Sequence, residues 1–313
     1  MMSLANIETD DPIKPIFNRK QRKISKFRDH YLPAYILVIP TVLLVAFFYV
    51  LPTLMSLFYG FVESENFGLK NKWVGLKNYE RLFHDKEFWA NLGNTFQYVI
   101  LFVPLVLIIA TFLALLLNQK IKGISVFRTI YFLPQITLPA ATALVWVVLL
   151  NRDYGLLNKM LGTDIGWLSD PKVVMFSLVL TAVWGSIGLK MVIILAGLQG
   201  ISVTLYEAGL LEGATGFKKF RYITLPLLTP TLFFVGIISV IEGTQVFEGI
   251  YFLLGRNSVV LEDVRSIVFS YFITTYRQNE PNYGAAIINI LLIINLLLTA
   301  LQFRLSKKWV FYE

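Results

Sequence analysis

Cysteine is absent from this chain of 313 residues, which excludes disulfide bonds and thiolate metal sites. Histidine is nearly absent, since only His30 and His84 occur, and their wide separation argues against a histidine metal cluster. The chain also lacks a GxxxxGK[ST] phosphate-binding loop, because the fragment GATGFKK does not have that spacing. No Ser/His/Asp set and no paired carboxylates within a site are evident, so the sequence argues against intrinsic catalysis.

Charge is scarce as well. Charged residues make up 15% of the chain, whereas 56% of the residues are hydrophobic and the mean hydropathy is +0.64. This composition is too apolar for an ordinary soluble domain, and the long apolar runs indicate membrane spans. The net charge of +8 therefore does not indicate nucleic-acid binding, since Lys and Arg gather in the cytoplasmic segments of membrane proteins.

The predicted fold is an all-α polytopic membrane protein with six transmembrane helices. Each predicted span has the length of about 20 residues that crosses about 30 Å of hydrocarbon. The spans cover residues 34–58, 94–118, 126–150, 173–198, 229–252 and 283–304. Several contain proline, which is tolerated where neighbouring helices satisfy the freed carbonyl groups. The domain prediction is an N-terminal tail over 1–33, a membrane domain over 34–304 and a C-terminal tail over 305–313.

The distribution of basic residues predicts that both termini are cytoplasmic. The first 33 residues are polar, hold seven Lys and Arg, and lack the early apolar core of a cleavable signal peptide. With the N-terminus inside, the inner segments hold sixteen basic residues and the longer outer segments hold eleven.

A polar segment from Tyr206 to Pro230, YEAGLLEGATGFKKFRYITLPLLTP, separates the fourth and fifth spans. Thr204 and Glu207 fit a capping box, with Thr204 as the N-cap of a short helix. Helical spacing then predicts an apolar stripe made of Tyr206, Leu210, Gly213 and Phe217.

Three interpretations of this helix remain open from the residues alone. It could lie on the lipid surface, cap the helix bundle, or insert into a groove of a cytoplasmic partner. Gly209 and Gly213 each cost a helix about 1 kcal/mol relative to alanine. That cost suggests a close approach of the helix backbone to another surface, which favours docking.

This segment also resembles the EAA signature of ABC importer permeases. The matching residues are Glu207-Ala208-Gly209, Gly213-Ala214 and Ile223-Thr224-Leu225-Pro226. Four further stretches resemble the carbohydrate branch of that family: VGLKNYERLFHDKEFWANLGNTFQYV, FRTIYFLPQITLPAATALVWVVLL, VWGSIGLKMVIILAGLQGI and QVFEGIYFLL. The fragment YGLLNKML resembles the family's exit from the third span.

The chain departs from the family pattern at a few positions. Gly209 stands where alanine is usual, and Glu212 and Glu248 stand where aspartate is usual. The segment GRNSVVLED stands in an outer loop where the family has a Thr-x-Gly-Gly-Pro turn. This difference leaves the details of contact with a receptor open.

The resemblance implies a type I ABC importer fold with a cytoplasmic coupling helix in the loop at about 202–226. It implies contact with an ATPase through Tyr206, Glu207, Ala208, Gly209, Leu210, Gly213, Ala214 and Phe217. The implied function is import of an oligosaccharide or a related sugar or polyol across a bacterial or archaeal cytoplasmic membrane. The implied partners are a second permease in a heterodimer, two ATPases that bind ATP and Mg²⁺, an extracytoplasmic sugar-binding protein and the lipid bilayer. No cofactor and no nucleic acid is expected on this chain.

Polar residues inside the predicted spans are candidates for the substrate path. Lys190 lies about 7 Å inward of the middle of its span, so it could extend to the inner surface or contribute to a cavity. Glu242 lies too deep to reach water and must face a cavity or find a partner. Gln245 at i+3 and Gly249 at i+7 are expected on the same helix face, whereas Glu248 could simply be solvated nearer the outer surface.

The function of these residues stays open between two interpretations. Glu242 and Gln245 could form a polar stripe along a sugar path, where Trp184 and Phe247 would stack on sugar faces. Alternatively, Glu242 could make an interhelical hydrogen bond that holds the bundle together.

Two other classes of protein compete with the importer interpretation. A secondary transporter driven by an ion gradient would need buried acids in matched repeats, and no convincing internal repeat is evident. A polytopic membrane enzyme would need a cluster of reactive residues at one membrane depth, and none is evident. The sequence does not identify the sugar.

Overall fold

The computed structural model of the protein describes residues 31–65, 70–119, 122–255 and 257–311. These described residues fall into two compact units, and the boundary between Phe58 and Tyr59 lies at the last residue of α3. In the first unit, α2 (Leu32–Val45), the π-helical turn η2 (Ala46–Val50) and α3 (Leu51–Tyr59) follow one another without a break. They form one apolar helix of 27 residues from Pro33 to Tyr59. Most of the predicted N-terminal tail lies outside the described residues.

The second unit is a helical bundle with one small hairpin. The hairpin pairs β1 (Val62–Glu65) with β2 (Lys70–Trp73) in antiparallel register, with Val62 opposite Trp73. The long helices are α5 (Lys86–Leu117), α6 (Ile124–Ile136), α7 (Pro139–Leu149), α9 (Pro171–Gly200), α12 (Leu225–Thr244) and α16 (Pro281–Ser306). The shorter elements are α4 (Lys77–His84), α8 (Leu156–Leu161), α10 (Val203–Leu211), α11 (Gly216–Lys219), the π-helical turn η3 (Phe220–Thr224), α13 (Glu248–Leu254), α14 (Leu261–Val264) and α15 (Ile267–Tyr276).

Within the described residues, five helices are long and apolar enough to cross a membrane. The pair α6 and α7 makes a sixth candidate, but the two helices meet at an angle of 101°. The prediction of an all-α polytopic fold is therefore confirmed, and the span predicted over 126–150 consists of two helices with a sharp bend between them. Thr137 and Leu138, both with extended backbone, separate the two helices between Pro134 and Pro139.

The predicted span over 229–252 is also interrupted. Helix α12 ends at Thr244, and the chain turns through Gln245–Phe247 before α13 begins at Glu248. Ser266 holds this turn, because its Oγ donates to the carbonyl oxygen of Val246 at 2.5 Å. At its other end the fifth span is longer than predicted, since a continuous helix runs from Gly216 to Thr244.

Helix α9 lies at the centre of the bundle, packed most extensively against α5 and also against α6 and α12. Small residues permit these close crossings. A Cβ atom on Gly188 would lie 2.3 Å from the carbonyl oxygen of Tyr131 on α6, and one on Gly197 would lie 2.4 Å from the hydroxyl of Thr231 on α12.

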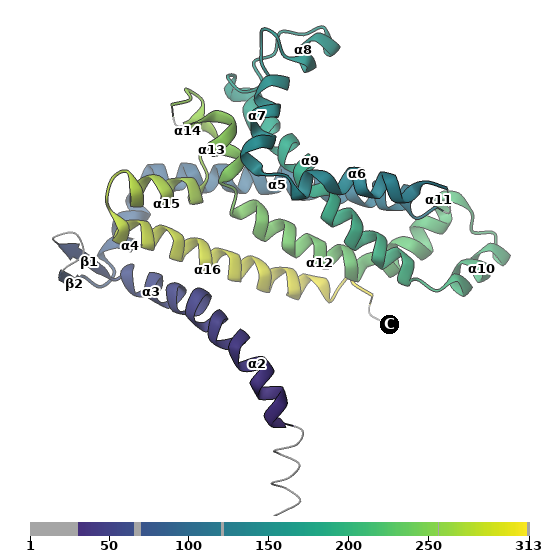
Figure 1. The fold of residues 1–313 in the computed structure, drawn as a ribbon, viewed down its shortest axis with the longest axis horizontal. Coiled ribbons are helices and arrows are strands. Elements are labelled where there is room, and N and C mark those ends of the chain that lie inside the picture. Colours follow the sequence, from purple (N-terminus) through teal and green to yellow (C-terminus); the bar gives the residue numbers. More distant parts are fainter. Residues whose placement is uncertain (1–30, 66–69, 120–121, 256, 312–313) are drawn as a thin grey trace, which may run out of the picture. The chain divides into compact units, whose positions relative to one another are not determined.

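The two ends of the bundle carry different structures (Figure 1). The loop with α10 and α11 lies at one end, together with the C-terminal end of α16. The hairpin, α4 and α15 lie at the opposite end. The predicted C-terminal tail packs on the bundle, since Val310 is buried and the Phe311 N–H donates to Thr229 Oγ1 at 3.0 Å.

Candidate functional site

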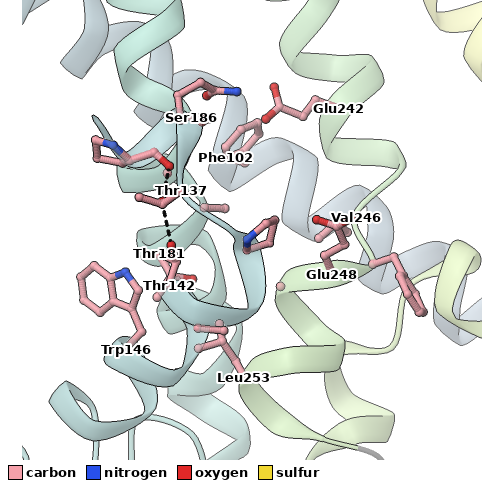
Figure 2. A pocket seen from close by; sticks show the side chains of 18 of the residues that line it. Phe102, Thr137, Thr142, Trp146, Thr181, Ser186, Glu242, Val246, Glu248 and Leu253 are labelled. Carbon is pink, nitrogen blue, oxygen red and sulfur yellow. Dashed lines mark hydrogen bonds between the residues drawn. The ribbon is translucent and has the colours of Figure 1, made fainter. Parts of the chain in front are cut away.

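A cavity of about 460 Å³ lies inside the second unit, at the level where two spans are interrupted. Figure 2 shows Thr137 and Thr142 at the break between α6 and α7, across the cavity from Glu242 and Glu248 of α12 and α13. The lining consists of Tyr98, Phe102, Pro134, Gln135, Thr137, Pro139, Thr142, Ala143, Trp146, Thr181, Ala182, Gly185, Ser186, Glu242, Gln245, Val246, Phe247, Glu248, Gly249 and Leu253. Interrupted spans expose polar groups at membrane depth only where they line such a space.

Glu242 lines the cavity and forms an ion pair with Lys190. Lys190 Nζ lies 2.6 Å from Glu242 Oε2, and the two side chains are 4% and 46% exposed, respectively. The lysine nitrogen also lies 5.5 Å from the centre of the Phe102 ring, close enough for a cation–π contact. Lys190 therefore points across the bundle toward α12 instead of extending to the membrane surface, and it lies behind the lining.

The two interpretations of Glu242 are not alternatives in this geometry. Its carboxylate makes an interhelical ion pair and also faces the cavity. Gln245, Glu248 and Gly249 line the same space, although they do not share a helix face with Glu242, because α12 ends at Thr244. Glu248 is exposed, as a solvated carboxylate would be, and it also belongs to the lining.

Aromatic side chains line the cavity from both sides, with Trp146 on α7 and Phe247 between α12 and α13. Trp146 is a lining residue that the sequence did not single out, and it packs edge-on against Trp184 with ring centres 5.7 Å apart. Trp184 itself is not a lining residue. Phe247 does line the cavity, and its ring also contacts Tyr251, Phe269 and Phe272.

Hydroxyl groups supply further polar positions. Thr137 Oγ1 donates to the carbonyl oxygen of Pro134 at 2.7 Å, so Thr142 Oγ1 is the donor in the 2.9 Å bond between the two threonines. Ser186 Oγ is buried and has no hydrogen-bond partner within the described residues. An unmet polar group beside a cavity is a position where a ligand hydroxyl can bond.

A second candidate site is the loop that joins α9 to α12. Helix α10 begins at Val203, two residues earlier than a capping box with Thr204 as the N-cap requires, so that prediction is wrong. Ser202 is the N-cap, and its Oγ accepts the Thr204 N–H at 3.3 Å. Glu207 is exposed further along α10, beyond the position from which it could bond the N-cap.

The predicted helix from Tyr206 to Phe217 is interrupted at Gly213. The Gly213 backbone has φ +78°, a left-handed conformation that favours glycine. Its N–H donates to the Leu210 carbonyl at 3.0 Å, and the Ala214 N–H donates to the Gly209 carbonyl at 2.8 Å. These are the two bonds of a Schellman motif, so Gly213 serves to end α10.

Gly209 has an internal role as well. It is buried, and a Cβ atom there would lie 2.4 Å from Cδ1 of Ile223 in η3. The two glycines therefore satisfy local requirements of this chain, and their presence is not an argument for an external partner.

The remaining apolar residues of the loop do face outward. Leu211 is 91% exposed, Phe217 is 75% exposed and Leu210 is 54% exposed. Tyr206 is half-buried, with its hydroxyl 3.3 Å from Thr224 Oγ1, and Ala208 is exposed on α10. We call the exposed group Leu210, Leu211 and Phe217 the apolar knob.

A multi-pass helical protein with interrupted spans around a polar cavity has the architecture of a transport protein. A family described as the binding-protein-dependent transport system inner membrane component matches residues 83–310. The chain belongs to this family, and it is a membrane-embedded transport component, not an enzyme.

Individual relatives agree with this assignment. The chain is 32% identical to a probable ABC transporter permease of Pyrococcus horikoshii over 85% of this chain and 92% of the relative. It is also 32% identical to the probable ABC transporter permease YesP of Bacillus subtilis, over 93% of this chain and 96% of the relative. It is 30% identical to the trehalose/maltose transport system permease MalF of Thermococcus litoralis, over 90% of this chain and 96% of the relative. The resemblance to ABC importer permeases is thus confirmed.

A solved structure shows the same fold. The chain aligns with a chain of a bacterial ABC transporter involved in the import of the acidic polysaccharide alginate. The TM-score is 0.77 with 21% sequence identity, over 92% of this chain and 99% of that one. The expected type I importer fold is therefore confirmed.

Proposed function

We propose that this chain is one of two membrane subunits of an ATP-driven importer that carries an oligosaccharide or a related sugar or polyol. The carbohydrate assignment is supported by the trehalose/maltose permease among the relatives and by the chemistry of the cavity. Hydroxyl, amide and carboxylate groups can bond sugar hydroxyls, while Trp146 and Phe247 offer flat apolar faces. An extracytoplasmic binding protein delivers the sugar to this cavity.

The exposure of the polar lining supports the proposal of a second permease. The Glu242 side chain is 46% exposed on this chain alone, and Gln245 and Glu248 are exposed as well. Ionisable groups at membrane depth face protein or a water-filled cavity, because contact with lipid is costly. A second permease that covers this side would complete the path.

The observation that carries the ATP-driven mechanism is the apolar knob. Leu211 and Phe217 are exposed on a short helical loop at one end of the bundle, and the chain lacks a phosphate-binding loop of its own. An exposed apolar helix of this kind inserts into a groove of its partner. Two cytoplasmic ATPases, which bind ATP and Mg²⁺, would dock on this loop of each permease, and their closure would move the helices around the cavity.

The docking end of the bundle is cytoplasmic in this proposal. The end of α16 lies beside the loop, and the basic residues Lys218, Lys219 and Arg221 follow the knob. Lys and Arg concentrate on the cytoplasmic side of membrane proteins. The two termini would both be cytoplasmic, in a bacterial or archaeal cytoplasmic membrane.

Charge substitutions in the knob test the docking. Leu211→Asp combined with Phe217→Asp should reduce both co-purification of the ATPase and sugar uptake at least about tenfold, because a docked apolar side chain contributes on the order of 1.4 kcal/mol or more. Exposed side chains support little of this chain's own stability, so its amount in the membrane should not change. Gly213→Leu would be a poor test, since the left-handed turn itself would be strained.

The matched control is Val259→Asp, which alters an equally exposed apolar residue in the loop between α13 and α14. The control should keep its ATPase. If the knob variant also retains the ATPase and normal uptake, the loop only rests on lipid or caps the bundle, and the docking proposal is wrong.

A further inference from the structure

The cavity carries negative charge that is only partly compensated. Among its twenty lining residues, all within the described part of the chain, two are carboxylates and none is Lys, Arg or His. Glu242 is paired with Lys190. Glu248 has no ion-pair partner within the described residues and faces the same space (Figure 2).

The position of Lys190 decides how this charge acts on a ligand. Its side chain is 4% exposed, and its Nζ is bonded to Glu242 and lies beside the Phe102 ring. The cation is therefore behind the wall, where it neutralises one carboxylate and offers no free donor to an anion. A carboxylate or phosphate on a ligand would meet the uncompensated charge of Glu248 across the cavity, and like charges repel.

We propose that this cavity discriminates by charge, so that this chain selects neutral or cationic carbohydrates and disfavours uronates and sugar phosphates. This inference rests on the proposed function in one respect, because it takes the cavity to be the path of the substrate.

The uncharged part of the lining fits the same substrate class. Ser186 Oγ is buried without a partner in the described part of the chain, and Thr142 and Gln245 also belong to the lining. These groups bond hydroxyls, which neutral sugars have in abundance. Trp146 and Phe102 offer ring faces that stack on a sugar and give no advantage to an anionic group.

Because the chain has no native cysteine, a single introduced cysteine can report the electrostatic potential inside the cavity. A single cysteine is introduced as Thr142→Cys, in the importer complex purified through this chain. The rates of modification by three methanethiosulfonates are compared: sulfonatoethyl (anionic), hydroxyethyl (neutral) and trimethylammonioethyl (cationic). Mass spectrometry of this chain reads the rates, so cysteines of other subunits do not interfere.

The rates are normalised to those of a surface cysteine, Asn257→Cys, so that intrinsic reactivity and size cancel. We expect the normalised cation-to-anion ratio at position 142 to be about tenfold or more, which corresponds to about 1.4 kcal/mol. Adding Glu248→Gln should lower the ratio several-fold. The matched control Glu63→Gln removes an acid from the hairpin and should leave the ratio unchanged.

A normalised ratio near or below one would overturn the proposal. A ratio that Glu248→Gln does not change, or that Glu63→Gln changes equally, would also overturn it, because the potential would not come from the cavity carboxylate. These readouts are independent of transport. If the normalised ratio is near one but ATP-driven sugar uptake is observed, only the proposal of charge selection is wrong. If no uptake is observed but the ratio is high, the assignment of the cavity as a sugar path is wrong, and its negative electrostatic potential is still shown.

Discussion

Lys190 and Glu242 lie 52 positions apart in the sequence, on α9 and α12, and their side chains meet at 2.6 Å. A lysine that is 4% exposed inside a helical bundle requires such a partner, because desolvation of an unpaired charge is costly. Membrane depth alone identified Glu242 as a residue that needs a cavity or a partner. The identity of that partner could not be predicted, because the rotation of two helices about their axes depends on how their side chains interlock.

The ion pair predicts coupled effects of substitution. Glu242→Gln leaves the buried Lys190 without its counter-charge, whereas Lys190→Met leaves Glu242 half-exposed to the cavity, so the first change should destabilise the protein more. The double variant should be less destabilised than the sum of both, with a coupling energy of about 1–3 kcal/mol, since one partner is only half-buried. Thermal unfolding of the purified complex, for both single variants and the double variant, measures this coupling energy. Strictly additive effects would show that the ion pair contributes nothing to stability.

At the scale of helices, the interruptions of the third and fifth spans place polar groups around the cavity. The hydropathy pattern predicted the existence of both spans, but it averages over many residues and does not detect a break. Pro134 and Pro139 flank the first break and were visible in the sequence, yet prolines also occur inside α5 and α12 without a sharp bend there. The second break, at Gln245–Phe247, is held by Ser266 from a distant segment, so its cause is not local.

In the loop between α9 and α12, the sequence predicted the right kinds of feature but not their exact positions. A capped helix and an exposed apolar group were both expected, and both are present. Ser202 replaced Thr204 as the N-cap, and Gly213 ended the helix that the apolar periodicity had extended to Phe217. The signal for the end was available, since a glycine after an apolar run commonly adopts the left-handed C-cap conformation.

The crossing of α6 and α9 gives a prediction at this scale. Gly188→Ala places a Cβ atom 2.3 Å from the Tyr131 carbonyl oxygen and 2.8 Å from the Phe132 Cα, both main-chain atoms that cannot move aside freely. We expect a loss of about 1–3 kcal/mol despite the better helix propensity of alanine.

The matched control is Gly185→Ala on the same helix, where nothing lies within 4 Å of the new Cβ atom. It should leave stability unchanged or raise it by up to about 1 kcal/mol. Unfolding midpoints of the two variants in detergent compare them directly. Equal midpoints would mean that α6 shifts easily, and that the bend beside the cavity is not fixed by this contact.

For the whole molecule, the described elements of the second unit connect the cavity to the loop with the apolar knob, which lies at one end of the bundle. Helices α9 and α12 connect the two sites, because both line the cavity and flank the loop between them. A displacement of the loop by a docked ATPase would therefore act on Glu242 and Ser186 through continuous helices. A secondary transporter would not need the exposed knob that Leu211 and Phe217 form.

The most direct test of this account is uptake into proteoliposomes that contain the complex purified through this chain. Radiolabelled neutral oligosaccharides are supplied outside together with the binding protein, and ATP and Mg²⁺ are enclosed. We expect accumulation that requires both enclosed ATP and the external binding protein, and that is lost in the Leu211→Asp/Phe217→Asp variant. Accumulation that proceeds without ATP and follows an imposed proton or sodium gradient would contradict it.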